Sequence, residues 1–310
     1  MCSSDLGAFR KGPELQAARV QPHVHAVGQS RVLVVGGVSG VVQQSSAGLP
    51  LKLMVPDALS GGVPAIKAEL IDVTATGKSI QSPADPGVGA LALSSSIRTP
   101  NGIAFVGGVD GTTGAAVAKA SVLTNLDEVA GNGAGKTTTV VTTAARVRPG
   151  LLVFPDDGTT VVWGGAPSRK VGELAELLVP GADKGVAVAV TGDAALLSSD
   201  YLHTAGSAVV VLAVTADQIT FLVTGGVPLA SPLVPSNALQ YVVQLDRAAK
   251  TAQIKPVALA GGGSLPGGFG VLGLPLADGR VLLAGGLLAT KKADPCPTQD
   301  RKSTRLNSSH

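Results

Sequence analysis

The chain has few of the residues that usually carry chemistry. Its 310 residues include two cysteines, four histidines, one tryptophan and two tyrosines. Two cysteines are too few for a disulfide framework or for a zinc site built from cysteine. Aromatic residues make up 3% of the chain, so any core must be built from Val, Leu and Ala.

Charge and long apolar runs are also scarce. Charged residues make up 15% of the chain and the formal net charge is +3. This small excess of positive charge does not indicate binding to nucleic acid or to an anionic membrane. The longest apolar stretch, Ala208–Val214, has the length of a strand and falls well short of the roughly 18 residues that span a bilayer. At 45% hydrophobic residues, the chain is nevertheless too apolar for disorder.

The two ends differ in character from the rest. Residues 300–310 (DRKSTRLNSSH) resemble a translated sequencing-adapter oligonucleotide, and residues 1–6 (MCSSDL) fit the complementary strand of the same DNA. We therefore expect residues 1–6 and 300–310 to be artefacts and residues 7–299 to be a single domain that is truncated at both ends. On this interpretation Cys2 belongs to the artefact and Cys296 is a lone thiol.

A short apolar strand that ends in Gly-Gly occurs five times, and this repeat is the strongest clue to the fold. The first glycines of the pairs are separated by 71, 57, 61 and 60 residues, the size of one stacked supersecondary unit. The copies are Arg31–Gly37, Gly102–Gly108, Thr160–Gly165, Ile219–Gly226 and Arg280–Gly286.

Each repeat can be divided into about four antiparallel strands. Asn-Gly or Asp-Gly turns precede the Gly-Gly strand, and such pairs suit two-residue hairpin turns. A strand with Asp near its end follows, as in Ala68–Asp72 and Gln240–Asp246. Helical patterns are scarce, and Glu14–Arg19 and Val171–Leu178 are weak candidates.

This pattern resembles the kelch-repeat and galactose-oxidase-like β-propellers. The resemblance rests on the five Gly-Gly strands, on the Asp-Gly turn in Ala277–Gly286 and on the Arg and His residues in Arg19–Gly37. It implies an all-β propeller of four-stranded kelch-like blades, about five repeats, with the ring incomplete. The chain departs from the family because a kelch repeat usually carries a Tyr and a Trp late in its sequence, and this chain has one Trp and two Tyr in total.

The segment Gly131–Thr138 (GNGAGKTT) is close to a nucleotide-binding P-loop. A P-loop has glycine five residues before its Gly-Lys pair, and here that position is Ala130. The segment also precedes the β-branched run Thr137–Thr143, which is a poor helix former. We therefore expect a hairpin turn here and no ATP binding.

Three other segments invite a functional interpretation. Asp156–Thr160 resembles part of the Asp-box turn of sialidase-like propellers but also fills the Asp-Gly turn of its repeat. His23 and His25 lie on one face of a strand, yet two ligands without a third make a poor metal site, so surface or turn histidines are expected. Asp110-Gly111 lacks the further acidic residues of a calcium loop.

The sequence assigns no catalytic, cofactor-binding or metal-binding residue. The first functional hypothesis is a non-catalytic scaffold module, outside the bacterial cytoplasm, that binds an unknown protein or carbohydrate ligand through its loops. The alternative is the propeller part of a carbohydrate-processing or oxidase-type enzyme whose active-site residues lie outside this chain, or a scaffold beside a lost catalytic domain. Copper-oxidase chemistry would have to draw on Tyr201, Tyr241, His23, His25, His203 and Cys296.

Two structural expectations follow from the repeat. The first spacing is about ten residues longer than the others, which places an irregular loop between Val38 and Pro64. An incomplete ring should leave one unpaired strand edge, near Val281–Ala284 or near Val32–Val35.

Replacing Lys136 by alanine tests the P-loop alternative. If the lysine lies exposed on a turn, Lys136→Ala should change the free energy of unfolding by no more than about 0.5 kcal/mol. Chemical denaturation of both proteins measures this change. Saturable ATP binding that disappears in Lys136→Ala would contradict the prediction.

Overall fold

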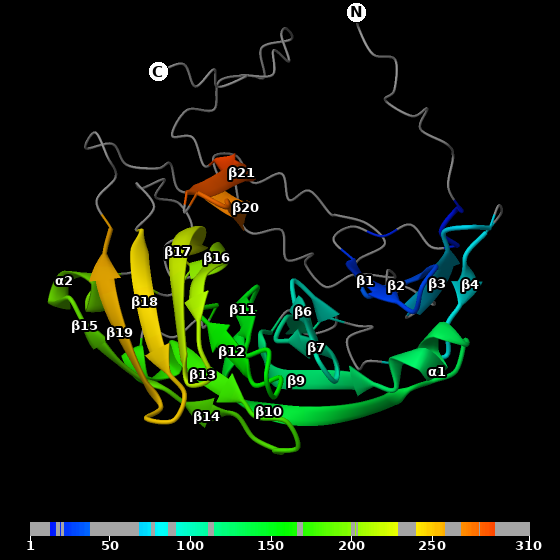
Figure 1. Cartoon of the computed structure of the whole chain (residues 1–310), viewed down its shortest axis with the longest axis horizontal. Helices are drawn as coiled ribbons and strands as arrows, with labels where there is room; N and C mark the ends of the chain where they lie inside the picture. The colour runs from blue at the N-terminus through cyan, green and yellow to red at the C-terminus, as the bar shows by residue number, and fades with distance from the viewer. Residues whose placement is uncertain are drawn as a thin grey trace, which may run out of the picture.

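The computed structural model consists mainly of β-strands, with short helices between some of them (Figure 1). The predicted loop at 38–64 and both terminal tails lie outside the described residues. The described residues are 13–16, 19, 22–37, 68–75, 78–85, 91–110, 115–165, 170–199, 202, 204–228, 240–257, 268–278 and 280–288.

Three four-stranded antiparallel sheets follow one another along the chain, each with its strands in sequence order. The first sheet contains β1 (His23–Val27), β2 (Arg31–Val35), β3 (Ala68–Asp72) and β4 (Ile80–Gln81). The second contains β6 (Ser95–Thr99), β7 (Gly102–Val106), β9 (Val117–Thr124) and β10 (Lys136–Arg146). The third contains β11 (Gly150–Val153), β12 (Thr160–Trp163), β13 (Ala175–Leu178) and β14 (Val186–Ala187).

The fourth sheet repeats this order and adds a fifth strand in parallel at its edge. It contains β16 (Thr204–Val214), β17 (Gln218–Pro228), β18 (Tyr241–Asp246) and β19 (Thr251–Pro256), with β15 (Ala189–Gly192) beside β19. The fifth sheet is the antiparallel pair β20 (Gly268–Pro275) and β21 (Val281–Leu288). A small separate ladder joins β5 (Leu91–Ala92) to β8 (Val109–Asp110).

The two segments that the sequence suggested as helices do not form α-helices in the described residues. The candidate helix Val171–Leu178 is a single 3-10 turn, η1 (Val171–Glu173), followed by strand β13, because its apolar residues are buried on both faces. Within the candidate Glu14–Arg19, Glu14 forms an isolated bridge with Lys78. The α-helices among the described residues are α1 (Leu126–Ala130) and α2 (Ala194–Leu197), which the sequence pattern did not predict.

The Gly-Gly pairs occupy the same place in four sheets, at the point where the second strand leaves the third. Each of these eight glycines has a positive φ, from +63° to +114°. Side chains other than glycine rarely adopt this conformation, so the pairs are fixed by backbone geometry. The pairs are Gly36-Gly37, Gly107-Gly108, Gly164-Gly165 and Gly225-Gly226.

The glycine backbone joins neighbouring strands and neighbouring sheets in a repeated pattern. The first glycine donates within its sheet, from Gly107 N to Lys119 O and from Gly164 N to Leu174 O, both at 2.8 Å. The second glycine donates to the chain that enters the next sheet, from Gly108 N to Arg146 O at 2.7 Å and from Gly165 N to Thr204 O at 2.9 Å.

A buried ion pair supports the glycine pair in the first and third sheets. Arg146 Nε lies 2.6 Å from Glu176 Oε1, and its Nη1 donates to Gly164 O at 2.6 Å. The backbone N–H of Thr143 donates to the other oxygen of Glu176 at 2.7 Å. Both charged side chains are fully buried, so removal of one partner would leave an uncompensated charge in the core.

Arg19 and Glu69 repeat this arrangement in the first sheet. Arg19 Nε lies 2.9 Å from Glu69 Oε1, Arg19 Nη1 donates to Gly36 O at 2.6 Å, and the Gln16 N–H donates to Glu69 Oε2 at 2.6 Å. Burial raises the pKa of Glu69, but the hydrogen bonds from Ser79 and Gln16 and the Arg19 guanidinium more than offset this, so the pKa lies below its usual value. The carboxylate is therefore held in its charged form.

Successive sheets pack face to face. The first strands β1, β6, β11, β16 and β20 contact one another in chain order. Because alternate residues of a strand point to opposite faces, each sheet offers one apolar face to the preceding sheet and the other to the following sheet. In Figure 1 the first sheet lies at the right, the second and third near the centre and the fourth at the left.

Of the two alternative places predicted for one free edge, the structure has it at Val281–Ala284 within the described residues. Val32–Val35 has no free edge, because β2 pairs with β1 on one side and β3 on the other. Within the described residues, β21 pairs with β20 alone, so the strand that contains Val281–Ala284 has one unpaired edge. None of the helices described is long and apolar enough to cross a membrane.

Glycine-to-alanine substitutions distinguish the cost of a positive φ from the cost of a steric clash between the added Cβ and neighbouring atoms. Gly107 has φ +66°, and an added Cβ would lie 2.4 Å from Arg146 O, so Gly107→Ala should lower the free energy of unfolding by more than about 2 kcal/mol. Gly181 has φ +83° but open space around it, so Gly181→Ala should cost about 1 kcal/mol. Urea unfolding measures both losses.

The control is Gly172→Ala, where no atom lies within 4 Å of the added Cβ. Its stability should change by no more than about 0.5 kcal/mol. Equal losses at all three positions would mean that the Gly-Gly geometry is not the constraint described.

Candidate functional site

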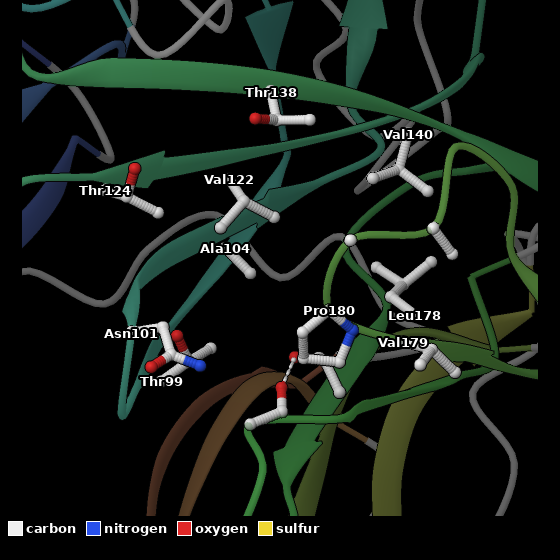
Figure 2. A pocket seen from close by; sticks show the side chains of 14 residues that line it. Thr99, Asn101, Ala104, Val122, Thr124, Thr138, Val140, Leu178, Val179 and Pro180 are labelled. Atoms are coloured by element: carbon white, nitrogen blue, oxygen red, sulfur yellow. Dashed lines mark hydrogen bonds between the residues drawn. The ribbon is translucent and has the colours of Figure 1, made fainter.

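A cleft of about 260 Å³ lies between the second and third sheets (Figure 2). One wall comes from the second sheet, where register places Ala104, Val122 and Thr138 side by side across β7, β9 and β10. The opposite wall comes from the end of β13 and the following turn, with Leu178 and Pro180. Figure 2 shows these two walls facing each other.

The strand alternation explains why this face is lined by small and β-branched side chains. In β7, Ile103 and Phe105 point to the first sheet and belong to its buried cluster, so Ala104 points to the third sheet. In β9, Leu123 likewise belongs to the cluster with the first sheet, which leaves Val122 and Thr124 on the cleft side. The small side chain at Ala104 leaves space that larger neighbours do not fill.

The deeper part of the same interface is closed. Val106 and Val140 of the second sheet pack with Leu151 and Val162 of the third in one buried cluster. The cleft therefore opens toward the end of the sheets where the β6–β7 and β11–β12 turns lie. Its lining also includes polar side chains: Thr99, Asn101, Thr124, Thr138 and Thr160.

The lining contains no titratable side chain. The Thr124 hydroxyl donates to Lys136 O at 3.2 Å and the Thr160 hydroxyl to Gly158 O at 3.3 Å. Asn101 Nδ2 donates to Asp157 O at 3.3 Å. A hydroxyl becomes a useful nucleophile only beside a general base, and the lining offers none, so this arrangement is suited to binding and not to acid–base chemistry.

The two histidines lie in the interface between the first and second sheets. His23 Nε2 and Ser94 Oγ are 2.7 Å apart, and His25 Nε2 and Ser96 Oγ are also 2.7 Å apart. Both rings meet the edge or face of Phe105, at centroid distances of 5.5 and 5.9 Å. The two histidines share one strand face as predicted, but the expected surface or turn position is wrong, because the serine hydroxyls satisfy the imidazoles inside the interface.

These histidines are neutral at pH 7. Burial, together with electrostatic interactions with His25 and Arg148, lowers the pKa of His23 to about 4. Burial and the charge of Arg98 lower the pKa of His25 to about 4. Among the described residues, no group of three or more His, Cys, Asp or Glu side chains could hold a metal ion.

The segment that resembles an Asp-box is a turn held by Arg247. The arginine Nη1 lies 2.9 Å from Asp157 Oδ1, its Nη2 pairs with Asp156, and its guanidinium lies 4.7 Å from the centre of the Phe154 ring. The Asp157 carboxylate also accepts the Thr159 N–H at 2.8 Å, as in an Asx-turn. The turn interpretation is confirmed, and the arginine connects the third sheet to the fourth.

The segment that resembles a P-loop joins the antiparallel strands β9 and β10. Helix α1 precedes the glycine-rich loop and strand β10 follows it, the reverse of the strand–loop–helix order that a P-loop requires. Lys136 is the first residue of β10 and is exposed. The hairpin connection is as expected, although the sequence pattern missed the helix within it.

Of the residues considered for copper-oxidase chemistry, the structure describes His23, His25 and Tyr241. The histidines lie between the first and second sheets and Tyr241 lies in the fourth sheet, so these three do not form one site. Tyr241 is buried, its hydroxyl accepts the Trp163 Nε1 proton at 2.9 Å, and burial raises its pKa above the usual value. Tyr201, His203 and Cys296 lie outside the described residues.

Sequence comparison does not assign the chain to a family. No protein-family model matches the chain, and no curated protein has significant sequence similarity to it.

The pKa shifts of His23 and His25 predict loss of stability in acid. Each folded-state pKa, about 4, lies below the ordinary 6.5, so the unfolded chain takes up these protons first. The contribution is therefore fully present above pH 6.5 and is lost as the pH falls toward 4. For His23 the loss should be on the order of 3 kcal/mol.

Urea unfolding at pH values across this range measures the effect. The double variant His23→Gln, His25→Gln keeps polar side chains at both positions and should depend less steeply on pH than the parent protein. Carboxylates titrate in both proteins and cancel in the comparison. An equally steep decline in the double variant would contradict the assignment.

Proposed function

We propose that this chain is a kelch-like β-propeller module that binds a partner and does not catalyse a reaction. The successive four-stranded meanders support this proposal, as do the glycine pairs at equivalent positions and the first strands that contact one another in chain order. The location outside the bacterial cytoplasm rests on the family resemblance alone. The enzyme alternative would need residues outside those described.

The observation that carries the binding function is the cleft between the second and third sheets. Its lining is largely apolar, includes threonine hydroxyls and one asparagine side-chain amide, and holds no titratable side chain. Pockets of this kind bind by apolar contact and use a few polar groups to orient the ligand.

The same lining indicates the class of ligand. An uncharged, largely aliphatic group matches the walls, and an aliphatic side chain on a loop of a partner protein fits this description. A carbohydrate fits less well, because each sugar hydroxyl that is buried without a polar partner carries a desolvation cost. A protein partner is therefore preferred within this proposal.

Filling the cleft tests the proposal. Thr138 lines the cleft and Thr139 is exposed on the opposite face of the same strand, so Thr138→Trp should block the cleft and Thr139→Trp should not. The probe is a set of uncharged aliphatic fragments, with binding measured by ligand-observed NMR. Fragments that bind the parent protein should lose at least about tenfold in affinity, or ~1.4 kcal/mol, in Thr138→Trp alone.

Circular dichroism and thermal unfolding verify that both variants fold. Fragments that bind Thr138→Trp as tightly as the parent protein, or a fragment set with no binders, would refute the cleft as the binding site.

A further inference from the structure

Successive sheets of this chain pack against each other in the same way, face to face. We call the side of a sheet that faces the next sheet along the chain its front, and the other side its back. The front of the first sheet packs Leu33 and Leu70 against Phe105 on the back of the second. The front of the third sheet packs Trp163 against Phe221 on the back of the fourth.

The front of the fourth sheet meets the back of the fifth. Gly273 of β20 lies so close to β16 that an added Cβ would be 2.2 Å from Val210 Cγ2. The glycine is half-buried, and its neighbours along β20 point the other way. The contact between β16 and β20 therefore repeats the arrangement between earlier first strands.

The front of the fifth sheet is apolar and exposed. Register pairs Leu272 with Ala284 and Leu274 with Leu282, so these four side chains share one face. Leu272 is 73% exposed, Leu274 58% and Leu282 50%. Leucines exposed together on a sheet face indicate an interaction surface.

The back of the first sheet is apolar and exposed along β1, whereas Val34 and the Arg19–Glu69 pair on the same face are buried. On β1, His23 and His25 point toward Phe105 on the second sheet, so Val24 and Ala26 lie on the back. Val24 is 58% exposed and Ala26 is exposed. The half-buried Val32 of β2 lies opposite Ala26 and extends this face.

We propose that the front of the fifth sheet binds the back of the first sheet of a second copy of this chain. The two faces are the two halves of an interface that the chain already makes between its own successive sheets, which is why a second copy is the partner they fit. The contact joins different patches on the two molecules. Such head-to-tail contacts form a ring when the rotation closes and a filament when it does not.

Two sets of substitutions test the proposal on the full chain. Leu272→Lys with Leu274→Lys places charges on the front of the fifth sheet, and Val24→Lys places one on the back of the first. Light scattering over a wide range of concentrations should show self-association of the parent protein. Each lysine variant alone should associate at least about tenfold more weakly, because a lysine buried at the contact would lose its hydration.

The decisive measurement is an equimolar mixture of the two variants. One retains an intact back and the other an intact front, so the mixture should form a one-to-one dimer that grows no further. The matched control is Val141→Lys at a valine of β10 that is 54% exposed and lies on neither face, and it should associate like the parent protein. Circular dichroism verifies that each variant is folded, and serine at the same positions gives a milder second set.

Several results would overturn the proposal. A parent protein that stays monomeric at every concentration would show that other residues of the same chain cover the leucine face. Association unaffected by Val24→Lys would indicate that two fifth sheets pair with each other. Loss of association in Val141→Lys, or a mixture that stays monomeric, would also exclude the head-to-tail contact.

Discussion

The structure depends on one backbone constraint, two consecutive residues in the left-handed conformation at the end of the second strand of a sheet. At this point the chain leaves its neighbour in the sheet and approaches the segment that enters the next sheet. Around Gly107 the approach is so close that a Cβ would overlap the Arg146 carbonyl. Glycine is the residue that meets both conditions, since it tolerates positive φ and needs no space for a side chain.

The buried arginine–glutamate pairs extend this constraint through the first and third sheets. Each arginine comes four residues before the first strand, pairs with a glutamate on the third strand and donates to the first glycine of the second strand. The charges thus join three parts of a sheet that are distant in sequence. At the position equivalent to the glutamate, the second sheet has Ser121 and the fourth has Tyr241. The arginine–glutamate pair is therefore found in the first and third sheets and not in the second and fourth.

The cleft and the exposed leucine face both follow from the alternation of side chains along the strands. A sheet that packs on both sides needs apolar residues at consecutive positions. Where one of these is small, as at Ala104, the interface opens into a cleft. Where no sheet covers the outer side among the described residues, as at Leu272 and Leu274, the same pattern leaves apolar side chains in solvent.

The sequence by itself determined the β class, the order of the strands and the positions of the glycine pairs. These features are local, because turn residues, alternation and glycine at positive φ act over a few neighbouring residues. The sequence also located the turn at Asp157, and one of its two alternatives for a free edge is the strand β21, which pairs with β20 alone among the described residues. It failed at Val171–Leu178, where burial on both faces overrides a helical spacing of apolar residues.

Tertiary structure alone decided which partners the polar side chains of the interior have. Arg146 and Glu176 are separated by 30 residues and become partners only when the third sheet is complete. His23 and His25 reach Ser94 and Ser96 across 71 residues, and this changes them from expected surface groups into neutral, half-buried ones. The cleft has no local signal either, because its two walls come from different sheets and it depends on how these sheets pack against each other.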